Sequence, residues 1–206
     1  MMFNPDSRSP NFFLPGLMPV LLLMVTVTLT SFSIVREKER GTLEQLLVTP
    51  LRPLGLMIGK LMPYFALSLF ETGVILTFMR YAFQVPIHGS VLLLVLLSTC
   101  YLFVNLATGM LISTKANSQS EAMQLATMTL LPSIFLSGYI FPVDNMPQIF
   151  QVLSKFIPAT YMMEISRGVI LRSAGLHELW LNALKLFASG VVVLLIAANR
   201  FRKMIV

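Results

Sequence analysis

The chain has 206 residues, of which 56% are hydrophobic and only 12% are charged, and its formal net charge is +6. A soluble globular domain carries about a quarter charged residues, so this composition indicates an integral membrane protein. The basic residues lie between apolar runs and form no stripe with interleaved aromatic residues, which argues against nucleic-acid binding. A single cysteine, Cys100, excludes a disulfide framework or a cysteine-based metal site within the chain.

Five apolar segments are long enough to cross the hydrocarbon core of a bilayer, which takes about 20 helical residues. They are too long and continuous for barrel strands, so the predicted fold is an all-α integral membrane protein. The predicted organisation is an extracytoplasmic tail, 1–14, followed by one polytopic transmembrane domain, 15–206. The predicted spans are residues 15–35, 61–83, 91–113, 122–141 and 179–199.

The segment 36–60, between the first two spans, contains a predicted short amphipathic helix. Thr42 and Gln45 have the spacing of a capping box, Gly41 permits a sharp entry, and Pro50 ends the helix. The apolar stripe of this helix consists of Leu43, Leu46 and Leu47. Such a helix can dock in a groove of a partner protein. The alternative is a stop-transfer cluster followed by a helix that rests on lipid.

Few polar side chains lie within the spans. Burying a charged side chain at the middle of a bilayer costs roughly 3 kcal/mol, so we expect Glu71 to face protein or water. Glu71 and Asn105 are the candidate residues of a substrate path. Asn105 also belongs to a group that can hydrogen-bond between helices, which is an ordinary packing device in membranes. The other members of this group are Thr26, Thr28 and Thr30.

The long connection 142–178, between the last two spans, contains two predicted short helices. Pro142, Pro147 and Pro158 divide it, and the second helix is predicted over 159–171. The helical spacing of apolar residues predicts the first helix, at Ile149, Phe150, Leu153 and Phe156. Two interpretations remain open, an interfacial or re-entrant element and a folded external loop.

The positions of lysine and arginine indicate the orientation. Most of them fall in 36–60, in the loop after the third span and after the last span, which predicts that these segments and the C-terminus are cytoplasmic. An odd number of spans then places the N-terminal tail outside. We therefore expect a further span upstream of Met1.

The sequence contains no pattern that predicts catalysis. The run from Gly55 to Lys60 has the wrong glycine spacing for a P-loop and no hydroxyl residue after the lysine. His88 and His177 have neither an HExxH pattern nor a cysteine partner, so no metal site is predicted. We expect no catalytic residue and no cofactor in this chain.

From about Asn4 to Arg202 the chain resembles the permease subunit of type-2 ATP-binding-cassette (ABC) exporters. The resemblance rests on the order of the spans and on two motif regions, REKERGTLEQLLVTPLRPLGLMIGK and FPVDNMPQIFQVLSKFIPATYMMEISRGVIL. It implies that the first region includes a coupling helix that contacts an ATPase subunit. The implied coupling residues are Glu37, Gly41, Thr42, Leu43, Glu44, Gln45, Leu46, Leu47 and Pro50.

The same resemblance implies that the second region forms short re-entrant helices near the outer mouth of the transporter. The residues singled out there are Pro142, Pro147, Pro158, Tyr161, Glu164 and Arg167. The implied protein lies in the bacterial inner membrane, pairs with a second permease copy as a homodimer or heterodimer, and exports a drug-like, lipid or glycan substrate. ATP is implied only on the partner subunit.

The resemblance also implies a departure from the family pattern. Such permeases usually begin with a first span and a sizeable extracytoplasmic domain, so this chain is expected to hold five of six spans. An alternative function is a truncated scaffold or accessory protein that binds the ATPase or a full-length permease without transporting. A third interpretation is a secondary carrier driven by protons through Glu71, although matching halves with interrupted spans are not apparent.

Overall fold

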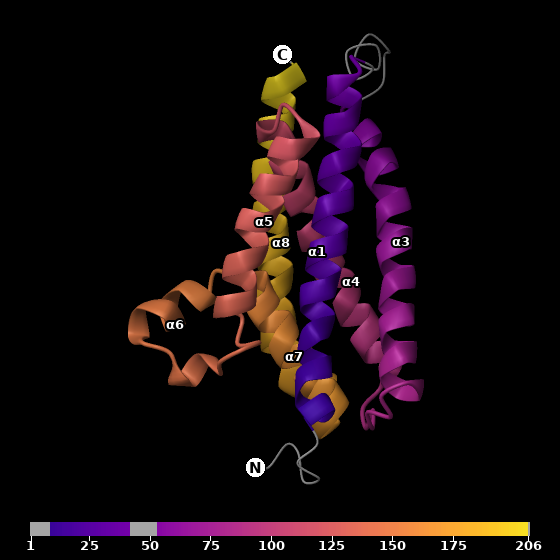
Figure 1. Ribbon diagram of the computed structural model, residues 1–206, viewed down its shortest axis with the longest axis vertical. Helices are drawn as coiled ribbons and strands as arrows, with labels where there is room; N and C mark the ends of the chain where they lie inside the picture. Colours follow the sequence, from indigo (N-terminus) through magenta and orange to yellow (C-terminus); the bar gives the residue numbers. More distant parts are fainter. Residues whose placement is uncertain (1–8, 42–52, 206) are drawn as a thin grey trace.

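The computed structural model describes residues 9–41 and 53–205, and it consists of long helices that run side by side with shorter helices at one end (Figure 1). The predicted amphipathic helix after Gly41 lies outside the described residues. The long helices are α1 (Ser9–Glu39), α3 (Pro53–Tyr81), α4 (Val91–Lys115), α5 (Gln119–Leu136) and α8 (Leu176–Ile205). The shorter helices are η1 (Val143–Asn145), α6 (Gln148–Ser154) and α7 (Pro158–Arg172).

The bundle has two different ends. At one end, which we call the charged end, α1, α4 and α8 finish and α3 and α5 begin (Figure 1). At the other, which we call the loop end, lie the start of α1, the α3–α4 loop and the helices η1, α6 and α7. The charged end consists of residues 36–41, 53–60, 115–121 and 196–205, and the loop end of residues 9–16, 81–91 and 136–176.

Four of the five predicted spans are confirmed as helices long and apolar enough to cross a membrane. Among the described residues these helices are Phe13–Glu39, Ile58–Tyr81, Val91–Lys115 and Leu176–Arg200. The predicted span 122–141 differs, because α5 has 18 residues, carries more polar side chains, and ends at Leu136. Gly138 has φ +86°, a left-handed conformation that ends a helix, so the apolar run that follows is not helical.

Two prolines explain how α1 is held at the loop end. Pro15 and Pro19 lie inside α1, and Pro19 has no N–H to donate to the Pro15 carbonyl. Ser166 of α7 provides a donor instead, with a buried hydrogen bond of 2.9 Å from its Oγ to Pro15 O. The Tyr101 hydroxyl of α4 donates to Pro19 O at 3.1 Å. The backbone of α1 is therefore bonded directly to two neighbouring helices.

Small residues bring the backbones of neighbouring elements close together. A Cβ added at Gly109 of α4 would lie 2.9 Å from the Val27 carbonyl oxygen of α1. A Cβ at Gly89 would lie only 2.3 Å from the Val169 carbonyl oxygen of α7. Close approach at small residues is a common way for membrane helices to pack without a hydrophobic driving force between them.

The two short helices of the outer connection have different environments. The predicted helix 159–171 is confirmed as α7, which packs against α1, α4 and α8. Its apolar side chains are fully buried, namely Met162, Met163, Ile165, Val169 and Ile170. In contrast, α6 projects from the side of the bundle (Figure 1). Its apolar side chains are exposed, namely Ile149, Phe150, Val152 and Leu153, and so is Phe156 just after it.

Candidate functional site

The charged end of α1 is the first part of the candidate site. Glu37 on the last turns of α1 forms an ion pair with Lys60 of α3, and the two side chains are 32% and 16% exposed. These residues lie on either side of the segment 42–52, which is outside the described residues. The ion pair therefore joins the two flanks of the predicted coupling segment.

The next two residues of α1 reach the α4–α5 turn. Lys38 Nζ donates to Ala116 O at 3.0 Å and to Asn117 Oδ1 at 2.9 Å. The Glu39 carboxylate accepts from the backbone N–H of Gln119 at 2.9 Å and from its side-chain amide at 2.6 Å. The sequence did not identify Lys38 or Gln119 as site residues. The contacts join positions about 80 residues apart, and the only local signal is the alternation of charges in the motif.

Gly41 is the other described residue of the predicted coupling set. Its φ is +68°, a left-handed conformation that glycine adopts without steric cost, and its N–H donates to Lys38 O at 3.2 Å. Gly41 therefore lies just past the end of α1, in the left-handed conformation that is common at helix C-termini. The remaining predicted coupling residues lie outside the described residues, namely Thr42, Leu43, Glu44, Gln45, Leu46, Leu47 and Pro50.

The two predicted path residues lie inside the bundle on different helices. Asn105 of α4 is 1% exposed, and neither polar atom of its side chain has a hydrogen-bond partner among the described residues. Glu71 of α3 is half-buried, with its Oε2 atom buried and unpartnered in the same part of the chain. The structure records no hydrogen bond between them. Thr26 does make the cross-helix bond expected of its group, with its hydroxyl 2.9 Å from that of Ser68.

Arg167, in the outer segment, clamps the end of α5. Its guanidinium donates to Gly138 O at 3.0 Å and to Tyr139 O at 3.4 Å, in the turn that follows α5. Burial lowers the pKa of this guanidinium from its usual value. The side chain still satisfies backbone carbonyls that the left-handed turn leaves outside the helix. It thus ties α5 to α7.

The three prolines of the outer segment each precede or begin a helix. Pro142 precedes η1, Pro147 precedes α6, and Pro158 occupies the first turn of α7, where a missing N–H costs no helical hydrogen bond. Their effect is to divide the connection into rigid pieces rather than one long loop.

Tyr161 and Glu164 link α7 to its neighbours. The Tyr161 hydroxyl donates to Lys155 O at 2.5 Å, and Lys185 Nζ of α8 lies 5.4 Å from the centre of the tyrosine ring. Partial burial and the Glu164 carboxylate raise the pKa of the Tyr161 phenol. Glu164 itself accepts from the side-chain amide of Asn182 at 2.7 Å.

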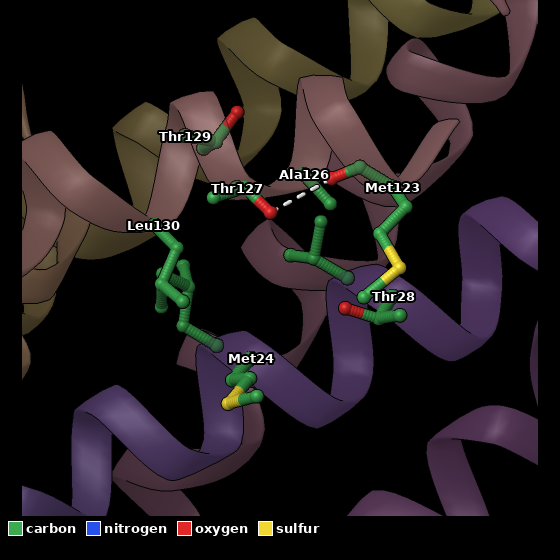
Figure 2. Close-up of a pocket in the computed structure, with 9 residues that line it drawn as sticks. Met24, Thr28, Met123, Ala126, Thr127, Thr129 and Leu130 are labelled. Carbon is green, nitrogen blue, oxygen red and sulfur yellow. Dashed lines mark hydrogen bonds between the residues drawn. The ribbon is translucent and has the colours of Figure 1, made fainter. Parts of the chain in front are cut away.

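A groove between α1 and α5 is the second part of the candidate site (Figure 2). It has a volume of about 80 Å³, and hydroxyl groups and methionine side chains lie along it. The Thr127 hydroxyl donates to Met123 O at 2.9 Å, within α5. The labelled lining residues are Met24 and Thr28 of α1 and Met123, Ala126, Thr127, Thr129 and Leu130 of α5.

The outer face of α5 differs from that of α8. Gln124 and Thr127 lie on the exposed face of α5, between Met123, Met128, Leu131 and Phe135. Most exposed residues of α8 are apolar, including Trp180, Leu184, Phe187, Val191 and Leu195. The exposed polar or charged residues described on α8 lie near its ends, except for Lys185, and are His177, Glu178, Lys185, Asn199 and Arg200. These α5 residues were not predicted from the sequence, although the polar side chains within segment 122–141 are a signal that could have found them.

The described part of the chain offers no ligand set for a metal ion, since nowhere in it do three His, Cys, Asp or Glu side chains come together. What the site does contain is a cluster of charged contacts at one end of the bundle and a groove of mixed polarity along α1 and α5. Such features suit contact with other proteins and with amphipathic molecules.

Comparison with known proteins adds a family match and several relatives. The family model described as "ABC-2 family transporter protein" matches residues 1–199. The chain is 36% identical over 191 residues to the probable multidrug ABC transporter permease YbhS of Escherichia coli K12, covering 92% of this chain and 51% of that protein. It is 34% identical over 208 residues to the inner membrane transport permease YhhJ of the same organism, covering 100% of this chain and 55% of that protein.

A eukaryotic relative is more distant. ABC transporter G family member 20 of Dictyostelium discoideum is 29% identical over 196 residues, which cover 94% of this chain and 27% of that protein. The chain spans about half the length of the bacterial relatives that it matches.

Proposed function

Since this chain belongs to the ABC-2 family of transporter proteins, we propose that it is the transmembrane permease subunit of an ABC exporter, and that a separate ATPase subunit supplies the energy. The bacterial relatives are named as permeases, and one of them as an inner membrane protein. The proposed location is accordingly the bacterial inner membrane, with the charged end and the C-terminus in the cytoplasm. The cargo is drug-like, lipid or glycan.

The ion pair between Glu37 and Lys60 is the observation that best supports coupling at the charged end. It joins α1 to α3 on the two flanks of segment 42–52. A force applied to that segment by an ATPase would therefore reach both helices together. ATP-driven closure of the ATPase pair then tilts α1 and opens a path toward the loop end.

Co-purification tests the ATPase partner. The tagged chain is expressed with candidate ABC ATPase subunits and extracted in detergent, and Leu46→Asp in the proposed coupling helix is compared with the unmodified chain. Leu153→Asp, the same change on exposed α6 at the opposite end, is the matched control. We expect the unmodified chain and the control to retain an ATPase and Leu46→Asp to lose it. No retention by the unmodified, membrane-inserted chain would contradict the ATPase partner and would favour a scaffold that binds only a full-length permease.

The second permease copy is proposed to cover the α1–α5 groove. Polar groups that face lipid are costly, so a span with the Gln124 side-chain amide on its outer face is better covered by protein or water than by acyl chains. The exposed faces of α3 and α8 are mostly apolar and suit lipid. This placement also accounts for the lower hydropathy of α5, which we propose as the fifth span. The substrate path then runs between the two copies, along Thr28 and Thr127.

A bulky substitution tests the position of the path. Thr127→Trp would fill the α1–α5 face, whereas Val191→Trp places the same ring on the apolar outer face of α8. We expect Thr127→Trp to abolish efflux of ethidium from cells that carry the whole transporter, and Val191→Trp to leave it unchanged. Equal efflux by both variants would contradict the proposed path.

The remaining predicted residues have secondary roles in this proposal. The unpartnered polar atoms of Asn105 and Glu71 take partners as α1 moves against α3 and α4. The outer segment, with α7 in the bundle and the apolar side chains of α6 in the outer leaflet, closes the path at the loop end. Arg167 holds this segment to α5 through its two carbonyl contacts.

A further inference from the structure

Three consecutive side chains at the end of α1 contact three different helices. Glu37 pairs with Lys60 of α3, Lys38 donates to the carbonyl of Ala116 after α4, and Glu39 accepts from Gln119 at the start of α5. Successive residues of a helix point about 100° apart, so one turn can reach several neighbours. The last turn of α1 is thus the junction of the charged end.

The signs of the charges match the helix ends that they contact. The C-terminus of a helix carries a partial negative charge and its N-terminus a partial positive charge. Lys38 lies at the C-terminus of α4 and Glu39 at the N-terminus of α5, so each contact is favourable in that orientation. Exchange of the two charges would make both unfavourable.

The α4–α5 turn is closed by its own residues and depends on α1 only for its position. Ser118 Oγ accepts from the backbone N–H of Glu121 at 3.2 Å, and the Glu121 carboxylate accepts from the N–H of Asn117 at 2.8 Å. These bonds hold the turn as one rigid piece. Loss of the contacts to Lys38 and Glu39 therefore releases the turn from α1 without unfolding it.

We propose that Lys38 and Glu39 are positioning residues that carry movement of the coupling segment to α5. The coupling segment, 42–52, follows Gly41, which is two residues after Glu39 in the chain. A displacement of that segment therefore moves Glu39 directly. Through Gln119 the displacement reaches α5, whose outer face lines the proposed path. This inference rests on the proposed function and adds a route from the coupling segment to the path that does not pass through α3.

The exposure of this junction suits a contact that breaks and forms again during each transport cycle. Lys38 is half-buried and Glu39 is exposed. Exposed charged contacts are weak and screened by salt, so they break and form again at little cost. A buried contact of the same kind would hold α1 and α5 in one arrangement.

A pair of exchanged side chains tests the inference in the full permease–ATPase complex reconstituted in liposomes. Gln119→Glu replaces the amide that donates to Glu39 with a second carboxylate. The two carboxylates then repel each other. Combining it with Glu39→Gln restores an amide that donates to a carboxylate, in the reverse direction. The measured quantities are retention of the ATPase, its basal rate, and ethidium transported per ATP hydrolysed.

We expect Gln119→Glu to keep the ATPase and its basal rate but to transport about fivefold less ethidium per ATP, which is the upper end for loss of an exposed charged contact. The double variant should return to within about twofold of the unmodified complex. Lys115→Ala is the control, because it removes a charge at the end of α4, beside the same turn. Lys115 makes no hydrogen bond or ion pair within the described ranges, so this variant should have no effect.

Two results would overturn the inference alone. One is normal transport per ATP in Gln119→Glu, and the other is a double variant as poorly coupled as Gln119→Glu. Failure of the unmodified chain to retain an ATPase is a separate result, which would overturn the proposed function and this inference with it.

Discussion

The two ends of α1 are held in opposite ways. At the loop end, Ser166 and Tyr101 donate to the backbone carbonyls of Pro15 and Pro19 in buried hydrogen bonds. At the charged end, α1 is held by long side chains that are exposed or half-buried, as in the pair of Glu37 with Lys60. Buried contacts are insensitive to salt, whereas exposed charged contacts weaken with it. The difference supports the proposal that the charged end is the adjustable end of the helix.

We expect the largest effect from a substitution in the α3–α4 loop, at the loop end. Gly89→Ala places a Cβ 2.3 Å from the Val169 carbonyl oxygen, and a backbone atom cannot give way as a flexible side chain can. Overpacking of this kind costs about 2–3 kcal/mol, which lowers the midpoint of thermal unfolding in detergent by about 5–10 °C. Gly175→Ala at the same end is the control, since its Cβ would meet nothing within 4 Å. Equal midpoints for both variants would show that the close approach is not needed.

The next effect concerns the proline carbonyl. Ser166→Ala removes the hydroxyl that donates to Pro15 O and leaves a buried acceptor without its donor. The expected cost is about 1–3 kcal/mol, or about 3–6 °C in the unfolding midpoint. Ser189→Ala is the control, because the hydrogen bond that it removes runs to Leu186 O within the same helix, α8. A control that is as destabilised as Ser166→Ala would contradict the account of Pro19.

A smaller effect is expected at the charged end. Lys60→Ala removes the ion pair with Glu37, which should lower stability by about 0.5–1 kcal/mol at low ionic strength. Because the pair is partly exposed, the loss should shrink in 1 M salt, where the screening length is about 3 Å. Thermal unfolding at both salt concentrations measures it. A loss that does not change with salt would mean that the two ends of α1 are held alike.

We expect the smallest effect at the middle of α1, between its two ends. Thr26→Val breaks the buried hydroxyl bond to Ser68 while keeping the shape of the side chain. Hydrogen bonds between membrane helices average about 0.6 kcal/mol, so the midpoint should fall by about 1–2 °C. The combined variant Thr26→Val with Ser68→Ala should lose no more than Thr26→Val alone. A clearly additive loss would indicate that the two hydroxyls do not interact.

The sequence predicted most of the long helices, because hydropathy and length are local properties of the chain. The spacing of apolar residues also located α7 to within a residue at each end. It did not reveal what covers that helix, since an apolar face looks the same whether lipid or protein buries it. The end of α5 was wrong by five residues because the apolar run continues past Gly138, although a glycine near the end of a helical pattern is itself a stop signal.

The contacts of the charged motif could not have been predicted from the sequence. Glu37 was assigned to coupling through the family resemblance, but Lys38 and Glu39 have partners in the α4–α5 turn, far along the chain. Their spacing carries no information about which helix ends lie nearby. The α1–α5 groove is a similar case, because it depends on which faces of two distant helices remain uncovered.

Cysteine cross-linking between permease chains tests whether the α1–α5 faces of two copies meet at the substrate path. In a Cys100→Ala background, Thr127→Cys on the outer face of α5 is compared with Phe187→Cys on the outer face of α8, in native membranes with a short bifunctional thiol reagent. We predict a covalent pair of permease chains for Thr127→Cys and none for Phe187→Cys. A covalent pair through Phe187→Cys, with none through Thr127→Cys, would contradict a substrate path between α1 and α5 of two copies.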